Sequence, residues 1–259
     1  MIRRFPALAA LATVVATLVV ACGGSVPGPA LTDPTAIVTA ALTSTEAAKT
    51  VHLEVAIDGT ATVGQPLGSG TGTPVDLTGT TASANIDFAN EAAKATFDVE
   101  KFNLAGELIA VGGKTYVKTT LTGPLYLEAP AGSIPVDPGS AGSLIDNLGD
   151  LLLKPGVVLV KGDDVSCGSE QCYTVSTDLT AAQLGLPADG MAGMPVDVAG
   201  ATLKLTIRVE KDLPYHLAGV TAVASMPNAT SLKLELTASK WDEPVSIQAP
   251  PANLVKPAS

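Results

Sequence analysis

Val51-His52-Leu53-Glu54-Val55-Ala56-Ile57-Asp58 is the stretch of sequence that decides the fold. Apolar residues occupy every second position, and mostly polar residues stand between them. Successive side chains of a β-strand point to opposite faces, so this period of two predicts a strand with one buried face. We therefore expect the stretch to lie in a sheet that is apolar on one side.

Further segments of strand-like sequence are separated by turn signals. Gly112-Gly113 divides two of them, and glycines there permit the positive φ angles of a tight hairpin. Residues 59–80, 130–138 and 185–200 are rich in Gly, Pro or other turn formers, so we expect loops there. Short connections favour antiparallel pairing. The expected further strands are 84–88, 95–100, 104–111, 114–118, 157–160, 173–175, 201–210, 215–225 and 231–240.

Helical signals begin at Asp33, a good N-cap, followed by Pro34 at the first helical position. This helix is expected to reach about Lys49 and to pack against the sheet. The residues near its packing face are Ala36, Ile37, Ala40, Ala41 and Ala47.

Two more helices are expected in the middle of the chain. Residues 143–153 carry apolar side chains at helical spacing and end before Pro155. Asp178 is expected to cap a short helix that ends near Leu184. The fold class is therefore α+β, an antiparallel sheet with helices on one side.

The composition sets a limit on the core. Thr, Val, Ala and Gly dominate, and aromatic residues make up only 3% of the chain. Aromatic side chains normally supply much of a core's buried area, so a tightly filled sandwich is harder to build here. An interior that is left partly open fits this composition.

The first 25 residues carry an export signal. Arg3 and Arg4 precede a mostly apolar stretch, residues 8–21, which is shorter than the roughly 20 residues that a spanning helix needs. It ends in Val19-Val20-Ala21-Cys22-Gly23, the pattern of a bacterial lipoprotein signal, in which Cys22 receives a diacylglyceryl group and becomes the mature N-terminus. Two acyl chains hold a protein at a membrane stably, where one binds only marginally. An ordinary secretory leader that contains a cysteine is the alternative.

Cleavage before Cys22 would leave 238 of the 259 residues and remove two basic residues and no acid. The formal charge of the mature chain is then −12, which argues against nucleic acid as a partner. So acidic a chain is not drawn to an anionic bilayer by charge, and the lipid anchor has to hold it there. We expect a signal peptide at 1–21, a lipidated flexible tether at 22–34, a single domain at 35–250 and a C-terminal tail at 251–259.

Cys167 and Cys172 are the cysteines that remain after lipidation. In an oxidising compartment the segment Cys-Gly-Ser-Glu-Gln-Cys is a ready disulfide, expected to staple 157–160 to 173–175. A metal site is the alternative, but no histidine stands near this pair. The spacing of four intervening residues also differs from that of a CxxC redox pair.

Recognisable catalytic motifs are absent from the sequence. His52 and His216 are the two histidines, and no Gly-x-Ser-x-Gly elbow occurs. Residues 68–73 are rich in glycine but lack the Gly-Lys-Ser/Thr end of a phosphate loop. The acidic pairs at 163–164 and 242–243 lack the ligand spacing of a calcium loop. We therefore expect no enzyme activity, no metal site and no cofactor.

Four features together resemble the LppX/LprAFG family of mycobacterial and actinobacterial lipoproteins. They are the lipobox at Cys22, the helix start at Asp33-Pro34 leading to 50–55, the hairpin at 112–117, and the ending Ser239-Lys240-Trp241-Asp242-Glu243-Pro244-Val245. The ending is the most specific of the four. The resemblance spans most of the mature chain and is patchy between 120 and 200, which indicates a divergent member.

The resemblance implies a strongly curved antiparallel sheet, a half-barrel, with helices packed on its concave side around an apolar cavity. It implies a lipoprotein, anchored on the extracytoplasmic face of the cell membrane, that binds and shuttles multi-acylated lipids or glycolipids across the envelope. A bound lipid would be cargo, and a membrane lipid exporter is a further implied partner. Two alternatives from other classes are a sensing or interaction domain with a filled core, and a structural envelope protein.

The wall of such a cavity would be built from inward residues of the strands and apolar residues of the helix at 143–153. Ordinary core packing is the alternative for each of them. Met191 and Met194 would form either an adaptable flap or only a loop. Trp241 either caps the sheet edge with its indole N–H bonded to a backbone carbonyl, which we favour, or contacts lipid. The cavity candidates are Leu53, Val55, Ile57, Ile86, Phe88, Leu144, Ile145, Leu148, Leu151 and Leu152.

Overall fold

The computed structural model describes residues 26–63, 73–129, 147–184, 200–226 and 229–256. These residues form one large sheet, a separate two-stranded ribbon and a few helices. The helices are α1 (Pro34–Ala47), the 3₁₀ helices η1 (Glu100–Phe102) and η2 (Ala252–Leu254), and the helical residues 147–152. The strands are β1 (Val26–Pro27), β2 (Thr50–Val63), β3 (Thr73–Asp76), β4 (Thr80–Asp87), β5 (Ala92–Val99), β6 (Leu104–Val111), β7 (Lys114–Thr119), β8 (Tyr126–Ala129), β9 (Val160–Lys161), β10 (Val165–Cys167), β11 (Glu170–Thr180), β12 (Thr202–Glu210), β13 (Asp212–Leu213), β14 (Leu217–Met226), β15 (Ala229–Ser239) and β16 (Val255–Lys256).

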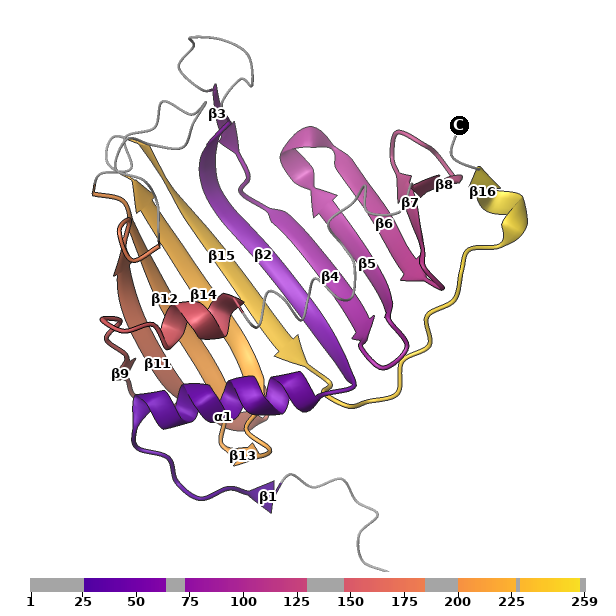
Figure 1. Cartoon of the computed structure of the whole chain (residues 1–259). Helices are drawn as coiled ribbons and strands as arrows, with labels where there is room; N and C mark the ends of the chain where they lie inside the picture. The colour runs from indigo at the N-terminus through magenta and orange to yellow at the C-terminus, as the bar shows by residue number, and fades with distance from the viewer. Residues whose placement is uncertain (1–25, 64–72, 130–146, 185–199, 227–228, 257–259) are drawn as a thin grey trace, which may run out of the picture.

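The large sheet is antiparallel, curved and open. Its strands follow the order β10-β11-β12-β14-β15-β2-β4-β5-β6-β7-β8-β16, with β3 paired to β2 and β9 paired to β11. Every pairing is antiparallel except that of β16 with β8. Figure 1 shows a curved sheet with α1 in front of it and with β11 and β16 far apart. The strands expected from alternation in β2, β4 to β7, β12, β14 and β15 are confirmed.

One face of this sheet is apolar across most of its width. Residues directly opposite each other on paired strands share a face, so the register assigns every side chain to a side. One row of such partners is Val175, Ile207, Val220, Leu236, Val55, Ala82 and Phe97. The adjacent row on the opposite face is Ser176, Thr206, Thr221, Glu235, Ala56, Thr81 and Asp98.

Helix α1 covers one half of the apolar face. The Asp33 side chain accepts a hydrogen bond from the Ala36 N–H at 3.0 Å, which confirms the predicted N-cap. The helix contacts β11, β12 and β14, as expected of a helix that packs on a sheet. Its packing face differs from the predicted one, because Ala36 and Ala47 are exposed. The buried residues are Ile37, Val38, Ala41, Ser44 and Thr45.

Two polar contacts explain why α1 packs on the sheet through other residues than the sequence predicted. The Ser44 hydroxyl donates to the Ala41 carbonyl at 3.0 Å and lies 2.9 Å from the Tyr215 carbonyl. A buried hydroxyl needs such partners, and the backbone around Tyr215 supplies one of them. This long-range contact is not visible in the helical periodicity.

Gly59 explains why β2 is longer than predicted. The strand continues to Val63 and pairs with β3, inside the stretch 59–80 that we expected to be a loop. Gly59 adopts a φ of +117°, and a Cβ atom there would lie 2.1 Å from the Ser231 carbonyl oxygen. Because glycine tolerates this φ angle, β2 can end its pairing with β15 at Gly59 and go on to pair with β3. Other residues would be strained at this position.

Three predictions between residues 157 and 184 are wrong. The strand expected at 157–160 is absent at 157–159, and β9 begins only at Val160. Asp178 does not cap a helix, because it lies within β11 opposite Lys204, and residues 181–184 form turns. The pairing of β11 with β12 along nine residues outweighs the local capping signal. The disulfide joins Cys167 and Cys172 as predicted, but it staples β10 to β11 rather than 157–160 to 173–175. A loop this short can connect only strands that are adjacent in sequence.

Both ends of the chain are more ordered than predicted. Val26 and Pro27, within the expected tether, form β1 and pair with β13. Residues 251–256, within the expected tail, form η2 and β16, and β16 extends the sheet beside β8. The folded unit therefore includes residues on both sides of the predicted limits 35 and 250.

The Cys167–Cys172 bridge should contribute modestly to stability. In the chain-entropy model a loop this small reduces the free energy of the folded state by about 2 kcal/mol relative to the unfolded chain. We expect Cys167→Ser/Cys172→Ser to lower the free energy of unfolding by about that amount in urea titrations. An unchanged urea midpoint in the double variant would contradict this assignment.

Candidate functional site

The half of the apolar face beneath α1 is filled by side chains. Strands β11 and β12 contribute Val175, Leu205 and Ile207, which are at most 4% exposed. They pack with Ile37 and Val38 of α1. The helical residues 147–152 add Leu148, Leu151 and Leu152 to the same cluster. This half is therefore an ordinary hydrophobic core.

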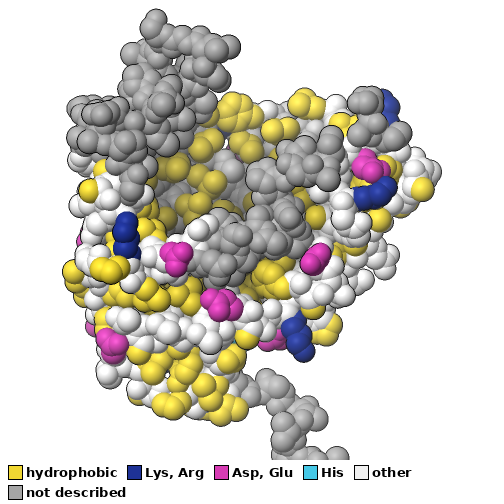
Figure 2. Space-filling view, in the orientation of Figure 1, with side chains coloured by type: hydrophobic (Ala, Val, Ile, Leu, Met, Phe, Trp, Pro, Cys, Tyr) yellow, Lys and Arg dark blue, Asp and Glu magenta, His cyan; other side chains and the backbone are white. Residues whose placement is uncertain are grey.

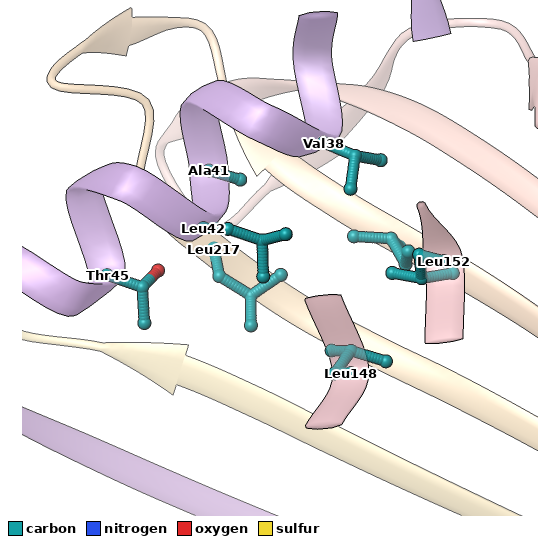
Figure 3. Close-up of a pocket in the computed structure, with 8 residues that line it drawn as sticks. Val38, Ala41, Leu42, Thr45, Leu148, Leu152 and Leu217 are labelled. Carbon is teal, nitrogen blue, oxygen red and sulfur yellow. The ribbon is translucent and has the colours of Figure 1, made fainter. Parts of the chain in front are cut away.

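The space left between α1, residues 147–152 and the sheet is small. Figure 3 shows Val38, Ala41 and Leu42 of α1 on one side of it and Leu148 and Leu152 on the other. The cavity volume is about 20 Å³, and its lining is apolar apart from Thr45. A volume of this size holds about one water molecule, so it does not accommodate an acyl chain.

Among the described residues, no helix covers the second half of the apolar face. It extends over β15, β2, β4 and β5, where the inward side chains are only half-buried. Figure 2 shows hydrophobic side chains gathered in a hollow above α1, between the two halves of the sheet. We call this surface the open apolar face. Its half-buried residues are Leu53, Val55, Ile57, Ala82, Ala84, Ala95, Phe97, Leu234 and Leu236.

One end of the open apolar face is closed by a small cluster. Val51 and Ile86 are buried there with Ala93, Ala110 and Ala238. Phe88 and Trp241 pack against these residues. The open apolar face thus has a packed floor at the end of the sheet where α1 leads into β2.

The indole nitrogen of Trp241 holds this residue against the packed cluster. Its indole N–H donates to the Leu217 carbonyl at 3.1 Å, and its ring stacks on His216 with centroids 4.9 Å apart. The expected backbone hydrogen bond is therefore confirmed. The residue stands at the ends of β14 and β15 in the middle of the sheet, however, and not at a sheet edge.

The structure brings most of the predicted wall residues to the same side of the sheet. Leu53, Val55 and Ile57 lie on the open apolar face, and Ile86 and Phe88 belong to its floor. Leu148, Leu151 and Leu152 belong to the filled half, where Leu152 is 2% exposed. Leu144 and Ile145, like Met191 and Met194, lie outside the described residues.

Sequence reasoning missed Phe97, Leu234 and Leu236. Phe97 lies on the inner face opposite Gly106, and a Cβ atom on that glycine would be 2.4 Å from the Phe97 ring. The missing side chain leaves room for the ring to lie flat over the neighbouring strand. Alternation within 95–100 and 231–240 carried the signal for all three residues.

The outer face of the neighbouring strands β5 to β8 carries a group of charged side chains. Glu107 lies 3.5 Å from the Lys94 Nζ and 3.7 Å from the Lys118 Nζ, and it accepts a hydrogen bond from the Tyr126 hydroxyl. Burial opposes ionisation of Glu107, but the hydroxyl and the two lysines outweigh it and hold the pKa of the carboxyl below its usual value. These ion pairs stand on the outer face beside a small apolar cluster of Ile109, Tyr116 and Tyr126, whereas the inner face of β15, β2, β4 and β5 is hydrocarbon.

Two depressions elsewhere on the surface include charged side chains in their lining. One of about 590 Å³ is lined by Arg208, Glu210 and His216 among others, and one of about 500 Å³ by Lys161 and Lys211 among others. Among the described residues, no group of three or more His, Cys, Asp or Glu side chains is placed to hold a metal ion. The described helices also include none long and apolar enough to span a membrane.

An open, curved antiparallel sheet with a helix across one half of its apolar face defines the class of fold. Crystal structures that share it include two mycobacterial proteins. LprF from Mycobacterium bovis aligns with 88% of this chain and 99% of its own, at 18% identity and a TM-score of 0.56. The lipoprotein LppX from Mycobacterium tuberculosis aligns with 84% of this chain and 100% of its own, at 18% identity and a TM-score of 0.52.

The fold is therefore LppX/LprAFG-like, as the sequence features indicated, and the sequence has diverged widely from both neighbours. No protein-family profile matches the chain, and no curated protein matches it in sequence.

Two leucines in the same row of the sheet test the difference between its halves. Leu205 on β12 is 4% exposed, whereas Leu234 on β15 is half-buried, and Ala222 lies between them. We expect Leu205→Ala to lower the free energy of unfolding by about 2–5 kcal/mol, as at filled core sites. Leu234→Ala should cost only about 1 kcal/mol, because less buried area is lost. Equal costs in urea titrations of the ligand-free domain would show that both halves are filled.

Proposed function

We propose that this protein is a membrane-anchored lipoprotein that binds a multi-acylated lipid or glycolipid and shuttles it across the cell envelope. The observation that carries the proposal is the open apolar face, a continuous hydrocarbon surface that α1 leaves half-exposed. In the proposed complex the curved sheet and its helices enclose the acyl chains on the concave side. The lipid is cargo, and the protein performs no reaction on it.

The energetics favour such a role for an apolar face. Moving one acyl chain of about 15 methylenes into water costs roughly 12 kcal/mol, at about 0.8 kcal/mol per methylene. A lipid with two or three chains therefore hardly crosses an aqueous layer unless a carrier covers them. The half-buried residues Val55, Ile57 and Leu236 offer aliphatic surface of the kind that can replace water around a chain.

The anchor belongs to the same proposal. The lipobox at Cys22 supports a diacylglyceryl modification, and the structural neighbour LppX is described as a lipoprotein. An anchored carrier stays near the membrane from which it takes its cargo. A membrane lipid exporter is the partner that we propose would deliver or receive the lipid.

Native mass spectrometry of unacylated residues 23–259, purified from an actinobacterial host, tests the carrier directly. We expect about one di-, tri- or tetra-acylated lipid per protein, identified after organic extraction. A ligand-free mass, together with a thermal stability that extraction does not change, would overturn the proposal and favour a sensing or interaction domain.

Adjacent residues of β2 provide a matched pair for the same test. Val55 faces the open apolar face, and Ala56 faces the charged outer side. An amide buried against hydrocarbon without a partner costs about 1–3 kcal/mol, so Val55→Asn should weaken binding of a fluorescent dipalmitoyl phospholipid roughly tenfold. Ala56→Asn places the same side chain in the same strand and should leave binding unchanged. A similar loss in both variants would argue against this face as the binding surface.

Cys22→Ala should release the protein from the membrane fraction without unfolding it, because the variant keeps the whole domain and loses the acyl anchor. Fractionation of cells that express each form, with circular dichroism of the released protein, measures both parts. Retention of the variant in the membrane would contradict acyl anchoring at this residue.

A further inference from the structure

The segment that follows the predicted anchor is fastened to the domain. Val26 and Pro27 pair with Leu213 and Asp212 as the β1–β13 ribbon. The Gly28 N–H donates to the Lys211 carbonyl at 3.3 Å and continues this pairing. Figure 1 shows β1 and β13 together beyond α1, at the end of the sheet opposite the β2–β3 hairpin.

Two tyrosines of the folded unit hold the next residues of the segment. The Tyr215 hydroxyl donates to the Pro29 carbonyl at 2.8 Å, and the Leu31 N–H donates to the Tyr173 hydroxyl at 3.0 Å. The rings of Tyr173 and Tyr215 belong to the hydrophobic core. We call residues 26–31, with these partners, the N-terminal clamp.

The clamp is tightly packed at Gly28. A Cβ atom on this residue would lie 2.3 Å from the Tyr215 hydroxyl oxygen and 2.5 Å from the adjacent ring carbon. No side chain fits at that position unless Tyr215 or the segment moves. A larger residue at position 28 therefore provides a way to open the clamp.

The covalent distance from anchor to clamp is short. Four Cα-to-Cα steps separate Cys22 from Val26, and a fully extended chain spans at most about 3.5 Å per residue. The Cα atom of Val26 can therefore be no more than about 14 Å from that of the acylated residue. A tether of this length cannot let the domain turn freely above a bilayer.

Three of the four residues of the β1–β13 ribbon are apolar, and Asp212 is the fourth. Val26 and Leu213 are direct partners in the ribbon and are 60% and 45% exposed. The mature chain is strongly acidic, so its net charge does not favour contact with an anionic bilayer. The contact then depends on the anchor and on this apolar pair.

We propose that the β1–β13 ribbon is a membrane-contacting surface, which holds the domain with this end against the bilayer and with the far end of β14 away from it. The inference rests on the acyl anchor of the proposed function. Leu217 to Ser225 of β14 spans about 26 Å at roughly 3.3 Å per residue, so the two ends of the sheet are well separated.

Site-specific quenching measures this orientation on the acylated, full-length mature protein. Cys22 is acylated in that form and Cys167 is bridged to Cys172, so an introduced cysteine is the reactive thiol. Leu213→Cys and Ser225→Cys, each labelled with nitrobenzoxadiazole and placed in phosphatidylcholine vesicles, mark the two ends. With headgroup-spin-labelled lipid added, we expect several-fold stronger quenching at position 213 than at position 225.

Two further variants separate the clamp from the anchor. Ten Gly/Ser residues inserted between Ser25 and Val26 leave the clamp intact but lengthen the tether, and quenching at position 213 should fall. Gly28→Val should open the clamp and reduce the difference between the two positions, with circular dichroism confirming the fold. Equal quenching at both positions in the otherwise unaltered chain would overturn the proposal.

Failure of the anchor is recognised independently. Mass spectrometry of Cys22 and flotation of the protein with vesicles report acylation before any quenching is measured. If the protein neither carries acyl groups nor floats, both the anchor and the orientation are wrong. If it floats but the two labels are quenched equally, the anchor stands and the proposed contact surface is wrong.

Discussion

The structure depends on a difference in size between the apolar face of the sheet and the helix that covers it. The face is wider than the helix is long. Ten neighbouring strands lie between β11 and β8, both included. Across these strands the sheet is about 43 Å wide, at roughly 4.8 Å between neighbours. Helix α1 has 14 residues and is therefore about 21 Å long at 1.5 Å per residue. It covers β11, β12 and β14, and among the described residues no helix of similar length covers the remaining apolar side chains. With few aromatic rings in the chain, the rest of the face is lined mainly by small and aliphatic residues, with Phe97 among them.

Much of the fold could be predicted because its signals are local. The alternation in 51–58, the glycine pair at 112–113 and the Asp33-Pro34 start each depend on neighbouring residues, and each is found in the structure. Asp178 shows where local reasoning fails. Its side chain suits a helix N-cap, but β12 pairs with this segment over nine residues and extends the strand through it.

The site could be predicted only in part, for a different reason. Alternation identified Leu53, Val55 and Ile57 as residues of one face, and the same rule applied to 95–100 and 231–240 would have added Phe97, Leu234 and Leu236. Which part of that face is covered depends on where α1 crosses the sheet. That crossing is fixed by distant contacts, such as Ser44 with Tyr215, and the sequence pattern of either segment does not contain them.

The two outer strands of the sheet have a consequence for the lipid-anchored form that we propose. An exposed strand edge is a template for pairing with another chain, and natural sheets limit this risk with very short edge strands. Here β10 has three residues and is bridged to β11, while β16 has two residues and runs parallel to β8. Molecules anchored in one leaflet meet far more often than the same number dissolved in a volume. In the anchored form that we propose, edges this short would limit strand pairing between neighbouring molecules.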